Sequence, residues 1–301
     1  MNMALEIKDV TKVYDSRAVV NHVSLAVERG ETFGLLGPNG SGKTTTIRMA
    51  LDIIRPESGN VSLLGGIPTR EALTRVGYLP EERGLYQKSK VMDILTYLGR
   101  LKRMDAATAR ARAKEMLQRV GLYDHRNKKV QALSRGMTQL VQFAGALLHK
   151  PDLIILDEPF AGMDPLNVQL MKEILREQQE RGATVVFSTH QMPDVEELCE
   201  RVLLINDGQS LLHGRLDELK RARGTHSVRV TAERQPEGIP GVVDTKFRNG
   251  SFEYLLGEGI KPDDVLRSFL NAGIPVERYE VVLPSLNQIF IEEVSRARNA
   301  K

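Results

Sequence analysis

The sequence has very little cysteine and no long apolar stretch. Its one cysteine, Cys199, excludes an internal disulfide and any metal site built from several cysteines. The longest unbroken apolar runs, Leu153–Leu156 and Val202–Ile205, have four residues each, whereas a membrane-spanning helix needs about 20 mostly apolar residues. We therefore expect that this chain by itself does not cross a bilayer.

The sequence also lacks a strong excess of charge of either sign. Lysine and arginine total 42 and aspartate and glutamate total 39, which gives a net charge of +3. A dedicated nucleic-acid binder usually carries a clear basic excess, so we expect no nucleic-acid partner. The composition, with 41% hydrophobic and 27% charged residues, is that of an ordinary folded protein. Residues 1–10 show no signal-peptide core, which together with the lone cysteine predicts a reducing cytoplasm.

What the sequence does contain is an alternation of strand and helix patterns. Residues 4–36 are typical of short strands, and the apolar run at 32–36 ends at a glycine-rich turn before a helical stretch at 44–54. Residues 91–148 have helical character. Beyond them strands and helices alternate, with strands expected at 153–156, 184–188 and 202–206 and helices at 165–181 and 193–199. This alternation predicts an α/β fold with a mainly parallel sheet and a helical subdomain at about 88–150.

The composition changes after about residue 217, and the remaining segment predicts a second, smaller α+β module. Lys220–Arg223 is basic and is most simply a linker, and residues 235–241 are rich in proline and glycine. Further elements follow, with strands expected at 227–231, 242–247, 252–256 and 276–283 and helices at 262–270 and 284–296. We therefore predict two domains, 1–216 and 217–301.

One motif in the first domain has the spacing of a phosphate-binding loop. It matches G-x-x-x-x-G-K-[ST] at every fixed position and consists of Gly37, Pro38, Asn39, Gly40, Ser41, Gly42, Lys43 and Thr44. Backbone N–H groups of such a loop, at the start of a helix, point inward and bind phosphate oxygens. Lys43 is expected to reach the β- and γ-phosphates of a nucleotide, and the Thr44 hydroxyl to coordinate Mg²⁺.

Two acidic residues follow the apolar strand expected at 153–156. Ligands of an open parallel sheet lie beyond the carboxyl ends of its strands, so Asp157 and Glu158 are expected to serve one site with the phosphate loop. Asp157 is a candidate Mg²⁺ ligand, and Glu158 is a candidate to orient or deprotonate an attacking water. His190 follows a third strand and suits a sensor of the γ-phosphate, although a lone histidine is more often structural.

In this order the motifs resemble those of the nucleotide-binding subunit of ABC transporters, over roughly residues 4–216. The matching motifs are Walker A at Gly37–Thr44, the end of Walker B at Asp157 and Glu158, the D-loop at 161–164 and the switch histidine at His190. The resemblance implies a P-loop ATPase cassette that binds ATP and Mg²⁺, with Thr45 also at the phosphates. It implies that Tyr14 stacks on adenine, while a strand-packing role for Tyr14 fits the pattern equally well.

The segment 133–137 resembles the family's signature, which usually reads Leu-Ser-Gly-Gly-Gln. Ser134 and Gly136 match it. The resemblance implies that these two residues close the nucleotide site of a second ATP-binding subunit packed head to tail. Arg135 and Met137 depart from the pattern. Arg135 adds a cation near that site, and Met137 removes the amide of the usual glutamine.

A further departure is Glu81, which stands where the family has a glutamine that contacts Mg²⁺ and the attacking water. A carboxylate can still coordinate the metal, so we expect Glu81 to take the glutamine's role. The residues at 135, 137 and 80–84, together with the C-terminal segment 283–294, resemble the branch that serves ABC-2-type permeases, which includes sodium and drug exporters.

The expected protein is therefore the ATPase subunit of an ABC exporter. It is expected to be coupled to a separate membrane permease and to lie on the cytoplasmic face of the cell membrane. Its second ATP-binding subunit is either another copy or a paralogue. A soluble ABC-type ATPase without a transport role is the alternative, and another P-loop enzyme such as a small-molecule kinase is a weaker one, since the signature and His190 speak against it. The C-terminal module is expected to regulate, dimerise or brace the cassette.

Overall fold

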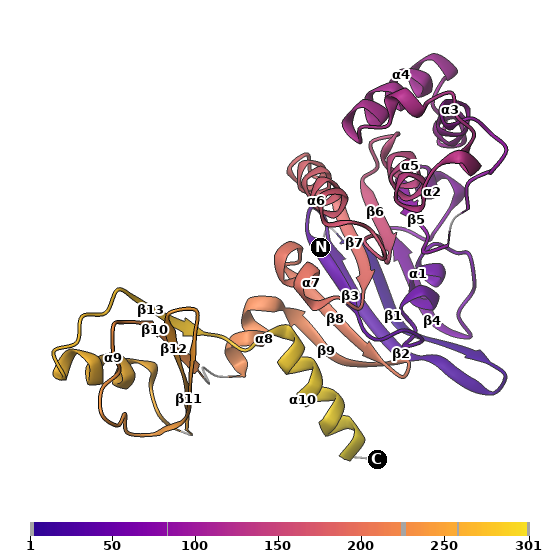
Figure 1. Cartoon of the computed structure of the whole chain (residues 1–301). Helices are drawn as coiled ribbons and strands as arrows, with labels where there is room; N and C mark the ends of the chain where they lie inside the picture. The colour runs from indigo at the N-terminus through magenta and orange to yellow at the C-terminus, as the bar shows by residue number, and fades with distance from the viewer. Residues whose placement is uncertain (1–2, 83, 224–226, 258, 300–301) are drawn as a thin grey trace. The chain divides into compact units, whose positions relative to one another are not determined.

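The computed structural model describes residues 3–82, 84–223, 227–257 and 259–299. The chain divides into two compact units, an N-terminal unit at Met1–Gly214 and a C-terminal unit at Arg215–Lys301 (Figure 1). Within the described residues, no helix combines the length and the apolar character needed to cross a membrane.

A six-stranded sheet forms the centre of the N-terminal unit, in the order β5-β6-β7-β3-β8-β9. Its strands are β3 (Thr32–Leu36), β5 (Val76–Leu79), β6 (Leu153–Asp157), β7 (Thr184–Thr189), β8 (Arg201–Asn206) and β9 (Gln209–Arg215). The pairs from β5 to β8 are parallel. Strands β3, β6 and β7 are buried along their whole length, as their short apolar runs indicate. The carboxyl ends of these three strands therefore share one edge of the sheet.

A second, antiparallel sheet in the same unit has the order β2-β1-β4. Its strands are β1 (Met3–Tyr14), β2 (Arg17–Glu28) and β4 (Ser58–Leu63). One hydrophobic core joins both sheets, with Ile7 and Val23 from this sheet and Leu35 and Ile155 from the central one. The first helix, α1 (Lys43–Ala50), contacts strands of both sheets. It is four residues shorter than expected at its C-terminal end, where Asp52 adopts a left-handed φ of 53° that no helix continues through.

The predicted helical region contains three helices that pack on one another at one end of the unit (Figure 1). They are α3 (Val91–Leu101), α4 (Ala106–Arg119) and α5 (Arg135–Leu147). Ser134 caps α5, since its hydroxyl accepts the Met137 N–H at 3.2 Å. Shorter helical segments are α2 (Arg70–Thr74) and the 3₁₀ turns at Tyr123–His125 and Val130–Ala132.

Two further helices follow the strands that end at the shared edge. Helix α6 (Pro165–Glu180) begins after β6, and α7 (Met192–Leu198) begins after β7. The lone cysteine, Cys199, follows α7 and is buried, which raises the pKa of its thiol well above the usual value. Its sulfur lies only 2.9 Å from the position that a Cβ on Gly34 would occupy. The sulfur therefore fills the space above β3.

The C-terminal unit is built on an antiparallel sheet in the order β11-β12-β10-β13. Its elements are α8 (Leu216–Ala222), β10 (Ser227–Thr231), β11 (Val242–Arg248), β12 (Ser251–Leu256), α9 (Pro262–Asn271), β13 (Arg278–Val282) and α10 (Leu286–Asn299). Alternate strand residues such as Val228 and Tyr254 form a core with Phe269 from α9. The period-two and helical patterns of the sequence predict these strands and α9.

The prediction that Lys220–Arg223 is a linker was wrong. Residues 216–222 form helix α8, with Asp217 and Glu218 in its first turn and Lys220 and Arg221 in its last. This charge order complements the helix dipole and supports a short helix. Arg223 then pairs with Glu293 of α10 at 2.7 Å, so the basic run belongs to the folded C-terminal unit.

Candidate active site

The glycine-rich loop connects β3 to α1 at the shared edge of the central sheet. The Gly37 N–H donates to the Thr189 carbonyl at the end of β7, at 3.3 Å. A Cβ on Gly37 would lie 2.1 Å from the Ile205 carbonyl oxygen. Gly42 has a φ of 110°, and a Cβ there would lie 2.6 Å from the Val19 carbonyl oxygen. Only glycine fits these two positions, so the path of the loop is fixed by its sequence.

Lys43 lies at the centre of this loop. Its ammonium group is buried and donates to the carbonyls of Gly37, at 2.8 Å, and Pro38, at 3.2 Å. The same nitrogen lies 3.2 Å from Oε1 of Glu158, which follows β6. Both side chains are only 5% exposed, so this is a buried ion pair that joins the phosphate loop to the acidic strand end.

Asp157 is the last residue of β6 and is completely buried. Strand register places it opposite Ser188 of β7, whose hydroxyl donates to Oδ1 of Asp157. Burial raises the pKa of Asp157, although hydrogen bonds from Ser188 and Thr44 oppose that effect. The other oxygen, Oδ2, is buried and has no hydrogen-bond partner within the described part of the chain. A carboxylate oxygen without a partner beside a threonine hydroxyl fits an Mg²⁺ site.

Glu158 occupies a strained backbone position. Its φ is 49°, in the left-handed region that non-glycine residues seldom adopt. Its N–H donates to Ser188, to the carbonyl at 3.2 Å and the hydroxyl at 3.1 Å, which holds this conformation. One carboxylate oxygen faces Lys43, and the other lies 3.0 Å from Nδ1 of His190. The strained backbone therefore places one buried carboxylate between Lys43 and His190.

A cavity of about 390 Å³ opens beside these groups. It is lined by Val19, Asn39, Gly40, Gly42, Lys43, Thr44, Thr45, Glu81 and Glu158. Most of these are predicted site residues, so residues far apart in sequence converge as expected. Ser41 lies behind the loop, where its buried hydroxyl oxygen has no hydrogen-bond partner among the described residues.

Eight predicted site residues are not among the lining residues. Five of them, Gly37, Pro38, Ser41, Asp157 and His190, belong to the loop and strand ends described above, and the other three are Tyr14, Ser134 and Gly136. Tyr14 stands half-exposed at the end of β1, with the Lys12 ammonium 5.4 Å from its ring centroid. Ser134 and Gly136 lie at the start of α5, away from the lining residues. The guanidinium of Arg135 rests 3.2 Å from where a Cβ on Gly162 would stand, so this departure from the signature contacts the D-loop of its own chain.

Comparison with known proteins decides the family. A model described as "ABC transporter" matches residues 20–161. An uncharacterised ABC transporter ATP-binding protein, YhaQ of Bacillus subtilis strain 168, is 38% identical over 293 residues, which is 96% of this chain and 98% of that protein. The chain belongs to the ABC transporter ATP-binding family. Members of this family bind and hydrolyse ATP, so this ABC protein is an ATPase.

Three more similarities extend the comparison for this ABC protein. Nod factor export ATP-binding protein I of Burkholderia lata is 39% identical over 213 residues, which is 70% of each chain. A solved ATP-binding subunit of an ABC transporter is 30% identical, with a TM-score of 0.69 over 73% of this chain and 93% of that one. A model for the C-terminal domain of DrrA1-3-like ATP-binding proteins matches residues 214–294.

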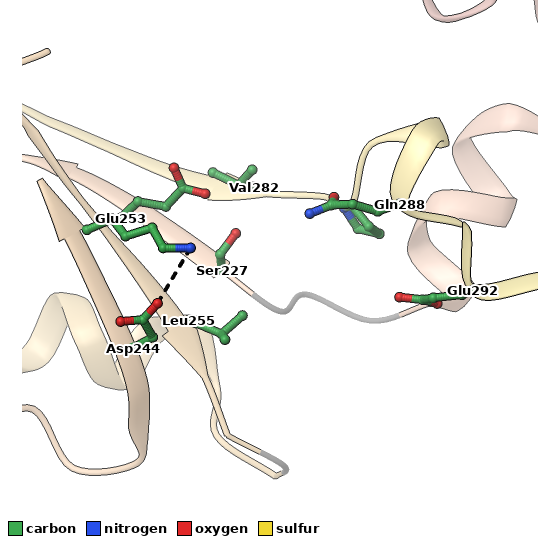
Figure 2. A pocket seen from close by; sticks show the side chains of 9 residues that line it. Ser227, Asp244, Glu253, Leu255, Val282, Gln288 and Glu292 are labelled. Carbon is green, nitrogen blue, oxygen red and sulfur yellow. Dashed lines mark ion pairs between the residues drawn. The ribbon is translucent and has the colours of Figure 1, made fainter. Parts of the chain in front are cut away.

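The C-terminal unit has a cavity of its own, of about 410 Å³. Figure 2 shows it between one face of the sheet and the start of α10. The Lys246 ammonium lies 3.5 Å from Oδ2 of Asp244. Its lining residues are Ser227, Asp244, Lys246, Glu253, Leu255, Val282, Pro284, Gln288 and Glu292. Within the described ranges, no group of three or more His, Cys, Asp or Glu side chains could hold a metal ion.

Two residues at the site were not found by sequence reasoning. Ser188 holds both Asp157 and the backbone of Glu158, and Val19 lines the cavity from β2. Ser188 had a signal, because it is a polar residue inside the apolar run before His190. Val19 had none, since its pattern is that of any strand.

Proposed function

We propose that this chain is the ATP-driven motor of an ABC exporter, working as one of two ATP-binding subunits with a separate membrane permease. One observation carries the proposal. Lys43, Glu158 and His190 come from three different segments and meet within hydrogen-bonding distance beside a glycine-rich loop. This arrangement suits phosphoryl transfer to water, where catalysis is mostly positioning and electrostatic stabilisation.

In this proposal the residues Gly37 to Thr45 hold the phosphates of ATP through their N–H groups. Thr44 and Asp157 hold Mg²⁺, and Glu81 lines the same cavity. Mg²⁺ would neutralise charge on the phosphate oxygens, and it is usually bound through one or two carboxylates together with substrate phosphates. The free oxygen of Asp157 supports that assignment.

Glu158 is the group that we assign to the attacking water. Phosphate oxygens compete with this carboxylate for the Lys43 ammonium, which is now 3.2 Å from it. When the ammonium turns to phosphate, the carboxylate can accept a proton from water. His190, whose Nδ1 lies 3.0 Å from the other oxygen, orients the carboxylate and faces the γ-phosphate.

The second subunit supplies the remaining contacts in this proposal. Ser134 and Gly136 are exposed or half-buried at the start of α5 and are free to meet the γ-phosphate bound by a partner chain, where the helix dipole favours an anion. Tyr14, half-exposed, is assigned to adenine stacking. The partner is a second copy or a paralogue.

A groove in the N-terminal unit supports coupling to a membrane permease. Its volume is about 290 Å³, and it is lined by Tyr78, Pro80, Gly84, Leu85, Leu98, Leu101, Lys102, Gln142, Gly145 and Ala146. The exposed rings of Tyr86 and Tyr97 extend the apolar surface near it. Exposed apolar patches of this kind mark protein contacts, so we assign the groove to a permease of the ABC-2 type. Such a complex would hold this chain on the cytoplasmic face of the membrane. The export direction rests on the relative named for Nod factor export.

The decisive experiment is Glu158→Gln. The amide keeps the shape of the side chain but cannot accept the proton, so ATP should stay bound and a dimer should accumulate. Size-exclusion chromatography with ATP and Mg²⁺ measures this, with the nucleotide-free variant as its control. A species that stays monomeric while binding ATP would count against the two-subunit scheme.

The role of Glu81 needs its own comparison. If this carboxylate acts in place of glutamine at the metal, Glu81→Ala should lower the Mg²⁺-dependent ATPase rate more than Glu81→Gln does. Glu82, its exposed neighbour, does not line the cavity, so Glu82→Ala is the matched control. Parental rates in both Glu81 variants would remove Glu81 from the site.

A further inference from the structure

Helices α6 and α7 are joined by a row of polar side chains outside the cavity. The Lys172 ammonium of α6 lies 2.8 Å from Oδ1 of Asp194 and 2.6 Å from Oε2 of Glu197, both on α7. Arg176, one turn further along α6, also pairs with Glu197. Residues four apart lie on the same helical face, so one side of α6 carries cations and the facing side of α7 carries anions.

The inner pair of this row is buried. Lys172 and Asp194 are each only 6% exposed, and Oδ2 of Asp194 has no hydrogen-bond partner among the described residues. Lysine and aspartate are almost never buried unless they are paired. Apolar side chains of similar volume would hold two helices together at least as strongly. A buried ion pair, however, fixes the position of one helix against the other more specifically.

Both helices that Lys172 joins follow a site residue in the sequence, since α6 begins at Pro165, seven residues after Glu158. Helix α7 begins at Met192, two residues after His190, and Asp194 lies in its first turn. On the other side, the Lys172 ammonium lies 5.7 Å from the ring centroid of Phe160, which is within range of a cation–π contact. Phe160 follows Glu158 by two residues. Lys172 therefore contacts both segments that leave the Glu158–His190 pair.

We propose that Lys172 is a positioning residue for ATP hydrolysis. It holds the start of α7 against the segment after β6 and so keeps Nδ1 of His190 at 3.0 Å from the Glu158 carboxylate. The inference rests on the proposed roles of Glu158 and His190. The phosphate-binding groups lie on the loop before α1 and do not contact Lys172. Its loss should therefore slow the chemical step and leave ATP binding intact.

The test compares three variants of the full chain. Lys172→Met combined with Asp194→Asn removes both inner charges without leaving a buried anion alone. Lys172→Arg keeps a cation in place. Arg176→Met is the matched control, because it removes the more exposed contact to the same Glu197. The measurements are kcat and KM for Mg-ATP, the affinity for ATP, and Tm as a check on folding.

The double variant should lose about 10- to 100-fold in kcat, the scale of a misplacement near 1 Å, while KM and ATP affinity stay near the parental values. Lys172→Arg should retain most of the activity, and Arg176→Met should stay within roughly twofold of the parent. If the double variant does not fold, Asp194→Asn alone keeps Lys172 paired with Glu197 and should show a smaller loss in kcat. A folded variant with parental kcat, or an equal loss of kcat in Arg176→Met, would overturn the inference. A parallel loss of ATP affinity would also overturn it, since it would indicate general structural damage.

Failure of the proposed function gives a different result. In that case Glu158→Gln hydrolyses ATP as the parent does. If Glu158→Gln is inactive but Lys172→Met/Asp194→Asn keeps the parental ATPase rate, only the role of Lys172 is refuted.

Discussion

The two units differ in how deeply they bury charged side chains. Among the described residues, every polar or charged side chain that is buried as a whole lies between Glu31 and Asp194, and these include Lys43 and Glu158. In the C-terminal unit, the paired side chains of Arg223 and Glu293 each stay 16% exposed. The C-terminal core is formed by Val228, Phe269 and similar side chains. Burying a charge is strongly unfavourable unless it is paired. The N-terminal unit therefore retains polar groups that are unfavourable to bury, whereas the C-terminal unit is built around an ordinary apolar core.

The largest change should come from the apolar core. Phe269 is completely buried in the C-terminal unit and packs edge-on against Tyr254, with ring centroids 5.9 Å apart. Phe269→Ala should cost about 3–5 kcal/mol of stability, because it leaves a large cavity. Calorimetry should show a lower transition for this unit, with Leu270→Ala, whose side chain is exposed, as the control. A lower ATPase rate in Phe269→Ala would contradict the division between the two units, since it would make catalysis depend on the apolar core of the C-terminal unit.

The buried cation of the N-terminal unit should affect activity instead. Lys43→Met removes the ammonium that holds the loop carbonyls and faces Glu158. We expect the ATPase rate to fall by roughly 10²–10³-fold, because a preorganised charge beside the phosphates is lost. Lys246→Met, at an exposed lysine of the C-terminal unit, should leave kcat unchanged. Equal losses in both variants would contradict the assignment of catalysis to one unit.

A smaller effect should appear in the response to acid. Burial, together with the nearby Lys102 charge, lowers the pKa of His149 to about 4. The unfolded value is about 6.5, so the folded state binds fewer protons between these values, and stability is lost as pH falls from about 6.5 to 4. The loss is on the order of 3 kcal/mol and belongs to the N-terminal unit. Urea unfolding at pH 7 and pH 5 should show a smaller difference in His149→Gln than in the parent. An unchanged difference would mean that other groups carry the acid response.

The sequence predicted the parts of the site that depend on local pattern. Gly37 and Gly42 are such parts, because backbone approaches of 2.1 and 2.6 Å allow no other residue. The strands of the C-terminal unit are another, since alternating residues decide their buried face. The comparisons then confirmed the family that these motifs indicate. The roles of the individual site residues stay predictions.

The rest depended on contacts between distant segments. Strand β4 contains Gly59 and Asn60, which strands seldom favour, and it forms because it pairs with β1. The strand register that sets Ser188 opposite Asp157, and the ion pairs of Lys172, have no local signature. The basic run at Lys220–Arg223 was misread for the same reason, since its partner Glu293 lies in α10.

The buried Cys199 has a practical consequence for spectroscopy. Its thiol is shielded and its pKa is raised, so it reacts slowly with thiol-directed probes. The natural chain is therefore a ready background for site-specific labelling, with no need to remove the native sulfur that fills the space above Gly34. One engineered cysteine at exposed Tyr97 and another at exposed Val243 would carry a donor and an acceptor dye. Energy transfer between them would measure the distance between the two labelled positions with and without ATP.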